Sequence, residues 1–128
     1  MRFMTEDRRS VAADFDARSA GYSKSQWHRA YAEGLIAHSA IRLGDRVLDA
    51  GVGTGFAAIA AATRVGPSGR VVGVDLSPGM LQQAQAAVEA AGLGNIELLE
   101  ADACALRDLP AEFFDAVICS AALLYMPV

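Results

Sequence analysis

Apolar positions along this chain follow two different spacings, and the spacings alternate from segment to segment. RVLDA (46–50) and RVVGVD (70–75) are short apolar runs, which are typical of strands buried in a sheet. GFAAIAAATRV (55–65) carries its apolar residues at helical spacing, and a second helical segment opens at Ser77 and Pro78, an N-cap followed by a first-turn proline. The pattern therefore predicts strands that alternate with helices.

Two more strands are expected further along the chain. NIELLEAD (95–102) has Glu97 and Glu100 suited to an exposed sheet edge, whereas FFDAVICS (113–120) is apolar through its centre, as a strand covered on both faces would be. Strands that alternate with helices form right-handed βαβ units. The predicted fold class is therefore α/β, a Rossmann-like doubly wound parallel sheet that is incomplete, with about four strands in the order 3-2-1-4.

The stretch before the first strand predicts an N-terminal helix. SQWHRAYAEGLIAHSAIR (25–42) is amphipathic, and its apolar face is expected to pack into the core. The residues that form this face are Trp27, Tyr31, Leu35 and Ile36. Residues 1–24 are polar and of mixed charge, so we expect a lid or loosely held segment there and one partial domain over 25–128.

Composition excludes several classes of partner. The net charge is −4, and the only lysine, Lys24, stands among scattered arginines, so neither a nucleic-acid groove nor a polybasic membrane patch is expected. No apolar run reaches the roughly 18 residues of a membrane-spanning helix. Cys104 and Cys119 lack the spacing of a zinc site and are too few for a disulfide framework. We expect a cytoplasmic protein with no metal site.

The candidate chemistry lies in VLDAGVGTG (47–55), between the first strand and its helix. Glycines let backbone N–H groups approach a ligand, and such loops commonly hold phosphates at a helix N-terminus. Residues 53–58 fit G-x-G-x-x-[GA], and Asp75 follows at about the distance of a ribose-binding acid. One interpretation is therefore a fragment of an NAD(P)-binding oxidoreductase.

Asp49, which we expect at the mouth of this loop, favours a different cofactor. A pyrophosphate near this carboxylate would bring like charges together in a partly dry cleft. S-adenosylmethionine carries a sulfonium and an α-ammonium, so the same carboxylate would attract it. The charge at position 49 therefore favours S-adenosylmethionine.

Three motifs in order resemble the class I S-adenosylmethionine-dependent methyltransferases. They are Val47-Leu48-Asp49-Ala50-Gly51-Val52-Gly53-Thr54-Gly55, then Val74-Asp75-Leu76-Ser77, then Ala101-Asp102-Ala103. Within that family the chain is similar to the ubiquinone/menaquinone biosynthesis C-methyltransferases, through GPSGRVVGVDLSPGMLQQAQ (66–85) and FDARSAGY (15–22). The second stretch departs from the group's pattern at Ser19, where alanine is usual.

The resemblance implies a set of cofactor-binding residues. They are Asp49, Gly51, Gly53, Gly55, Asp75, Leu76, Met80, Asp102, Ala103, Ser120 and Tyr22. It implies that Asp75 accepts hydrogen bonds from both ribose hydroxyls, pairing with the ribose rather than with the protein. Leu76 and Met80 are expected to sandwich the adenine, and Asp102 to accept from its amino group beside the Ala103 backbone. Structural roles, such as Met80 in the core or Asp102 in a turn, remain open.

Ser120 and the N-terminal segment are expected at the other end of the cofactor. Ser120 would face the methionine moiety, and Tyr22 with Phe15 would close a lid. His28 and His38 are interpreted as surface or helix-packing residues rather than bases.

The implied activity is methyl transfer to a small-molecule acceptor, with no catalytic base identified. Methyltransferases of this family have a seven-stranded sheet, and this chain supplies four strands, so we expect a cofactor-binding half. A non-catalytic S-adenosylmethionine-binding or interaction module is a further alternative. The apolar, unpaired edge at residues 113–128 also predicts self-association as a homodimer or larger assembly.

Overall fold

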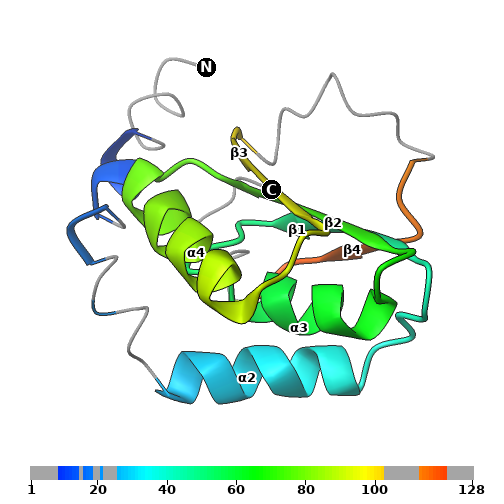
Figure 1. The fold of residues 1–128 in the computed structure, drawn as a ribbon. Coiled ribbons are helices and arrows are strands. Elements are labelled where there is room, and N and C mark those ends of the chain that lie inside the picture. The colour runs from blue at the N-terminus through cyan, green and yellow to red at the C-terminus, as the bar shows by residue number, and fades with distance from the viewer. Residues whose placement is uncertain (1–8, 15, 19–20, 22–25, 103–112, 121–128) are drawn as a thin grey trace.

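A four-stranded parallel sheet forms the centre of the molecule (Figure 1). The computed structural model describes residues 9–14, 16–18, 21, 26–102 and 113–120. The strands are β1 (Arg46–Ala50), β2 (Arg70–Asp75), β3 (Ile96–Glu100) and β4 (Ala116–Ile118). Their order is β3-β2-β1-β4, all pairs being parallel, which confirms the predicted fold class and topology.

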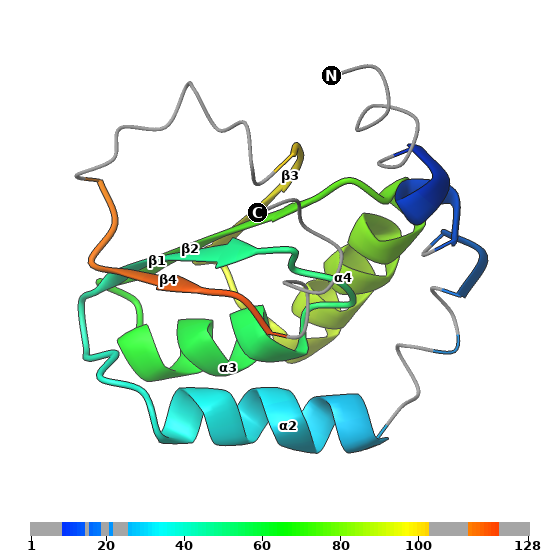
Figure 2. The same cartoon turned by 180° about the vertical axis from the view of Figure 1, so that it is seen from behind.

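Three helices lie on one face of this sheet (Figures 1 and 2). They are α2 (Gln26–Ala37), α3 (Phe56–Val65) and α4 (Pro78–Ala91). α3 packs on β1 and β2 through buried alanines, whose small side chains let the helix lie close to Val47 and Val71. α2 packs on the outer side of α3 and buries Ala32 and Ile36. Both ends of α4 lie where the capping residues in the sequence predicted them. The Ser77 hydroxyl accepts a hydrogen bond from the Met80 N–H at its start, and Gly92 adopts a left-handed conformation at its end.

The predicted apolar face of the N-terminal helix is wrong for its two aromatic residues. Trp27 is 65% exposed and Tyr31 is 50% exposed, while the buried face carries Ala32 and Ile36. The contact surface offered by α3 is made of alanines, so small and branched side chains pack against it and large rings do not.

The same helix ends five residues earlier than the expected Arg42. The Arg64 guanidinium on α3 donates hydrogen bonds to the carbonyl oxygens of Ile36 (3.1 Å) and Ile41 (2.6 Å). These carbonyls lie at and beyond the end of α2, where the arginine satisfies backbone groups and complements the negative end of the helix dipole.

The second sheet face carries its own apolar cluster. Leu48, Val72 and Val74 are buried there, with Leu99, Ala101 and Phe114 packed against them. Val117 of β4 is nevertheless 63% exposed, so the expectation that the fourth strand is covered on both faces is wrong at this position. At the other edge, β3 exposes Glu97 as its polar pattern predicted, and this carboxylate forms an ion pair with the Arg70 guanidinium at 2.8 Å.

Candidate functional site

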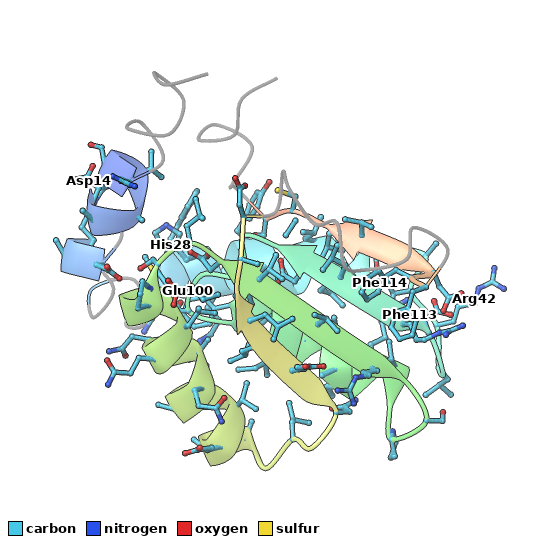
Figure 3. All side chains as sticks on the ribbon, turned by 90° about the horizontal axis from the view of Figure 1, so that it is seen from above. Asp14, His28, Arg42, Glu100, Phe113 and Phe114 are labelled. Atoms are coloured by element: carbon cyan, nitrogen blue, oxygen red, sulfur yellow. The ribbon has the colours of Figure 1, made fainter. Side chains whose placement is uncertain are left out.

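A cavity opens where β1 and β2 end, beside the N-terminal half of α2. Its wall combines the glycine loop, the end of β2, the first turn of α4 and one side of α2. The lining residues are His28, Tyr31, Ala32, Gly51, Val52, Gly53, Thr54, Gly55, Phe56, Ala57, Asp75, Met80 and Ser120. Figure 3 shows His28 at this end of the sheet, with Phe113 and Phe114 at the opposite end. The cavity therefore occupies the carboxyl edge, where open α/β sheets bind ligands.

The glycine loop adopts a backbone that glycine favours. Gly51, Gly53 and Gly55 have φ values of 76°, 57° and 94°. A Cβ atom on Gly55 would lie 3.3 Å from the Cβ atom of Ala84 on α4, so the loop also needs the missing side chain for close packing. These requirements explain the glycines without any ligand, and they fix the loop tightly over the sheet.

Most of the loop's N–H groups donate within the protein. The Gly51 and Val52 N–H groups donate to the Val74 carbonyl at 2.9 and 2.8 Å, and the Gly55 N–H donates to Val52 at 3.1 Å. The Gly53 N–H donates to the Asp75 carboxylate at 2.8 Å. Four donors that could cradle a phosphate are therefore already paired.

Asp75 fastens the loop to the next strand and helix. One carboxylate oxygen accepts from Gly53, and the other accepts from the Ser77 N–H at 2.9 Å. The expectation that Asp75 pairs with ribose rather than with the protein is thus wrong in its second half. Each oxygen keeps a further lone pair, so the carboxylate can still accept from a ligand at the cavity wall.

The pKa of Asp75 is raised by two effects and lowered by one. Burial raises it most, backbone N–H groups of Ser77, Gly53 and Leu76 oppose that rise, and the nearby Asp16 carboxylate adds to it. The site therefore concentrates negative charge around this carboxyl group.

Asp49 lies beneath the loop, not at the mouth of the cavity as expected. Its side chain is 1% exposed, and neither carboxylate oxygen has a hydrogen-bond partner among the described residues. Burial, with a smaller contribution from the Asp75 charge, raises its pKa from 3.8 to about 7. A carboxylate buried in this way favours a cation nearby.

The other predicted site residues divide into three groups. Met80 is buried and lines the cavity, and Ser120 lines it from the end of β4. Leu76 and Asp102 are half-buried and lie outside the lining set. Ala103, Tyr22 and Phe15 lie outside the described residues, so the adenine contact at position 103 and the predicted lid stay predictions.

Sequence reasoning missed the role of Asp16. One of its carboxylate oxygens accepts hydrogen bonds from the Ser77 hydroxyl (2.5 Å) and from the Gly79 N–H (2.6 Å) at the start of α4. These contacts join the N-terminal segment to the helix that supplies Met80 to the cavity. The FDARSAGY pattern had marked the residue, but no spacing indicated its partner.

His28 and Tyr31 were also missed as cavity residues. Both line the cavity from the N-terminal half of α2. The helix directly precedes the strand that carries the glycine loop, and that adjacency was the signal available in the sequence.

Among the described residues, no group of three His, Cys, Asp or Glu side chains could hold a metal ion. Within that same part of the chain, no helix has the length and apolar character needed to cross a membrane.

Comparison with known proteins identifies the family of this chain. A family model described as a methyltransferase domain matches residues 47–128. The chain belongs to this methyltransferase family. The match begins at the first residue of the glycine motif, and it confirms the resemblance to class I S-adenosylmethionine-dependent methyltransferases.

Two relatives show which methyltransferases this chain is similar to. Aklanonic acid methyltransferase DauC of Streptomyces sp. (strain C5) is 34% identical over 122 residues, which are 94% of this chain and 55% of that protein. The ubiquinone/menaquinone biosynthesis C-methyltransferase UbiE of Ectopseudomonas oleovorans is 38% identical over 109 residues, 84% of this chain and 63% of that protein. The chain spans about half to two thirds of the length of these relatives.

Solved structures agree with the fold of the methyltransferase chain. A SAM dependent methyltransferase from Aquifex aeolicus matches with a TM-score of 0.61 and 28% identity, covering 69% of this chain and 46% of that one. TrmN from Thermus thermophilus matches with a TM-score of 0.67 and 32% identity, covering 80% of this chain and 31% of that one. The oxidoreductase alternative finds no support in these comparisons.

Proposed function

We propose that the cavity binds S-adenosylmethionine and that the chain serves methyl transfer to a small-molecule acceptor. The observation that carries the proposal is that carboxyl groups lie at the loop while most of its N–H groups already donate within the protein. Asp49 is buried behind the cavity and the half-buried Asp75 lies in its wall, while the N–H groups of Gly51, Val52, Gly53 and Gly55 are already paired. This arrangement suits a cationic sulfonium and ammonium and offers little to a pyrophosphate.

Each predicted residue then has a role that its position supports. The remaining lone pairs of Asp75 would accept from the ribose hydroxyls, and Met80 would form one wall of the adenine site. Leu76 and Asp102, at the ends of neighbouring strands, would complete the adenine site once the cofactor is bound. Ser120 would face the methionine moiety, and Asp49 would act from beneath the loop through its charge.

When it is bound, the cofactor supplies an electrophilic methyl group, so the protein mainly positions the reactants and sets the electrostatic field. DauC and UbiE are named for methylation of aklanonic acid and for ubiquinone/menaquinone biosynthesis. We infer from them a small, ring-containing acceptor for this chain. The cytoplasmic location stays a prediction.

Hydrogen–deuterium exchange with S-adenosylhomocysteine, the demethylated product, tests the proposed site. Saturating product should slow exchange in residues 51–56 and in the first turn of α4. A matched experiment with NADH should leave both segments unchanged. Protection confined to other segments, or no protection at all, would contradict the assignment of the cavity.

A further inference from the structure

Two large aromatic side chains stand exposed on α2 without a role in packing the core. Trp27 and Tyr31 are one helical turn apart, and their rings stack with centroids 5.8 Å apart and planes at 16°. The helix already buries Ala32 and Ile36 against α3. Exposed apolar surface that a fold does not need for its own packing marks a binding surface.

This aromatic pair is continuous with the cofactor cavity. Tyr31 itself lines the cavity, as does His28, whose ring meets that of Trp27 edge to face at 4.8 Å. The glycine loop lines the same cavity. A molecule lying against the pair would therefore be next to the cofactor site.

The chemistry of the surroundings indicates what such a molecule is. Nearly parallel rings present a flat apolar face, which suits another flat ring through offset stacking. The residue after His28 is the cationic Arg29, and its guanidinium lies over the Phe56 ring, 5.1 Å from the ring centroid. The Asp75 carboxyl group in the cavity, with Asp49 behind it, disfavours an anion. An uncharged planar ring fits these constraints.

We propose that Trp27 and Tyr31 form the subsite that holds the flat, uncharged ring of the methyl acceptor beside the glycine loop. The proposal rests on the proposed function for the identity of its ligand as an acceptor. It makes these two side chains specificity-determining residues that touch the substrate, and it assigns them no part in proton transfer.

The single tryptophan of the chain makes the subsite directly observable, because its fluorescence reports on position 27 alone. The probe is 2,3-dimethyl-1,4-naphthoquinone, whose substituted ring cannot add to the cysteine thiols. With S-adenosylhomocysteine present, the quinone should quench the fluorescence saturably. Tyr31→Ala should weaken its affinity roughly three- to tenfold, the loss of one aromatic stacking partner. The flexible, non-aromatic 1,4-cyclohexanedione should give no saturable signal.

Leu43→Ala is the matched control, because Leu43 is also an exposed large apolar residue, at 80% exposure, and lies outside the cavity lining. It should leave the quinone affinity unchanged. Equal affinity in the wild type and Tyr31→Ala, or quenching that never saturates, would overturn the subsite. A lower particle mass for Tyr31→Ala, with unchanged quinone affinity, would mean that the aromatic pair forms a contact between protein chains. That result would also overturn the subsite.

A calorimetric titration of S-adenosylhomocysteine into the same proteins separates this proposal from the proposed function. Product binding by the wild type, together with quinone binding that Tyr31→Ala weakens more than it weakens product binding, supports both proposals, because Tyr31 also lines the cavity. Product binding without a quinone site overturns the subsite alone. Quinone binding that depends on Tyr31, in a chain that binds no product, overturns the proposed function and leaves the ring site standing.

Discussion

The carboxylate of Asp75 accepts a hydrogen bond from the backbone N–H of Gly53 at 2.8 Å, joining the end of β2 to the loop that follows β1. The other oxygen of the same carboxylate holds the Ser77 N–H. One side chain therefore sets the position of the loop and the start of α4 while it lines the cavity. The cavity wall and the loop geometry are thus coupled at a single residue.

Asp75→Ala is expected to weaken S-adenosylhomocysteine binding at least tenfold, because one hydrogen bond to a charged group contributes about 1.5–3 kcal/mol. Part of the loss should come from the loop, so exchange of the Gly53 amide should become faster even without ligand. Calorimetry and hydrogen exchange measure the two effects. Glu97→Ala, which removes an exposed carboxylate on β3, should change neither. Unchanged affinity in Asp75→Ala would exclude a role for this carboxylate in the site.

Asp49 is expected to make stability depend on pH in the ligand-free protein. Burial raises the pKa of Asp49 from 3.8 to about 7, so the folded state holds a proton that the unfolded state releases. The resulting stabilisation is fully present below 3.8 and is lost as the pH rises to about 7. Relative to Asp49→Asn, the wild type should lose on the order of 4 kcal/mol of unfolding free energy between pH 4 and 8. Urea denaturation across that range measures the difference, and parallel curves would contradict it.

The same residue should distinguish the methyl donor from its product. S-adenosylmethionine carries a sulfonium that S-adenosylhomocysteine lacks. Asp49→Asn should therefore weaken binding of the methyl donor more than binding of the product at pH 8. Calorimetric titrations with both compounds measure this ratio. Equal losses would mean that Asp49 acts on the shared ammonium group or on the loop alone.

Asp16→Ala is expected to loosen the N-terminal segment from α4. It removes the acceptor for the Ser77 hydroxyl and the Gly79 N–H, and it should lower the unfolding free energy by about 1 kcal/mol. Trypsin cleavage after Arg18 should become faster, as followed by mass spectrometry. Asp16→Asn keeps a carbonyl oxygen at the same position and should restore most of the protection. If Asp16→Ala is cleaved no faster than the wild type, the contact does not hold the segment.

Two glycine substitutions should have opposite effects on stability. A Cβ atom at Gly73 on β2 would lie 2.7 Å from a side-chain atom of Val52 in the glycine loop, so Gly73→Ala should destabilise the protein by about 1–3 kcal/mol and weaken product binding. Gly34 in α2 has no atom of the described residues within 4 Å of its Cβ position, apart from its chain neighbours and the backbone of its own helix, so Gly34→Ala should stabilise the protein by about 0.5–1 kcal/mol. Thermal denaturation compares the two. A neutral Gly73→Ala would contradict the close packing of loop and strand.

We also propose self-association through residues 113–128, of which the structure describes 113–120. Val117→Lys tests this better than a lysine at the neighbouring Ile118, because Val117 is 63% exposed and Ile118 packs in the core. The wild type should scatter light as more than one chain per particle at micromolar concentration, and Val117→Lys should reduce the mass without loss of helical content. A monomeric wild type would exclude the assembly.

The sheet and its order followed from the sequence because local signals were strong and mutually consistent. β1 and β2 have the predicted bounds, and a glycine borders the first run at its end and the second run at its start. The sequence predicted α2 in the right part of the chain, but the helix buries a different face from the predicted one. The buried face depends on the alanines of α3 against which it packs, and not on the pattern of α2 alone. Helical periodicity alone cannot show that a tryptophan is left exposed.

Part of the cavity lining was predictable from the sequence, and the contacts within it were less so. The motif identified Asp49 and Asp75, but it did not show that the loop covers Asp49 or that Asp75 accepts a hydrogen bond from Gly53. These contacts depend on how the loop folds back, which the spacing of the residues does not encode. The Asp16 contact joins residues 61 and 63 positions apart, so only the fold brings them together. Cavity residues His28 and Tyr31 were missed because nothing in the helix pattern shows which turn lies beside the loop.

The central claim, that this loop holds a cationic S-adenosyl cofactor rather than a dinucleotide, is tested most directly by calorimetric titration of one protein preparation. S-adenosylmethionine, S-adenosylhomocysteine and NADH are titrated separately at pH 8, where Asp49 is ionised more than half. The account predicts saturable binding of both S-adenosyl compounds, tighter for the cation, and no heat of binding from NADH. Saturable binding of NADH with no response to either S-adenosyl compound would contradict it.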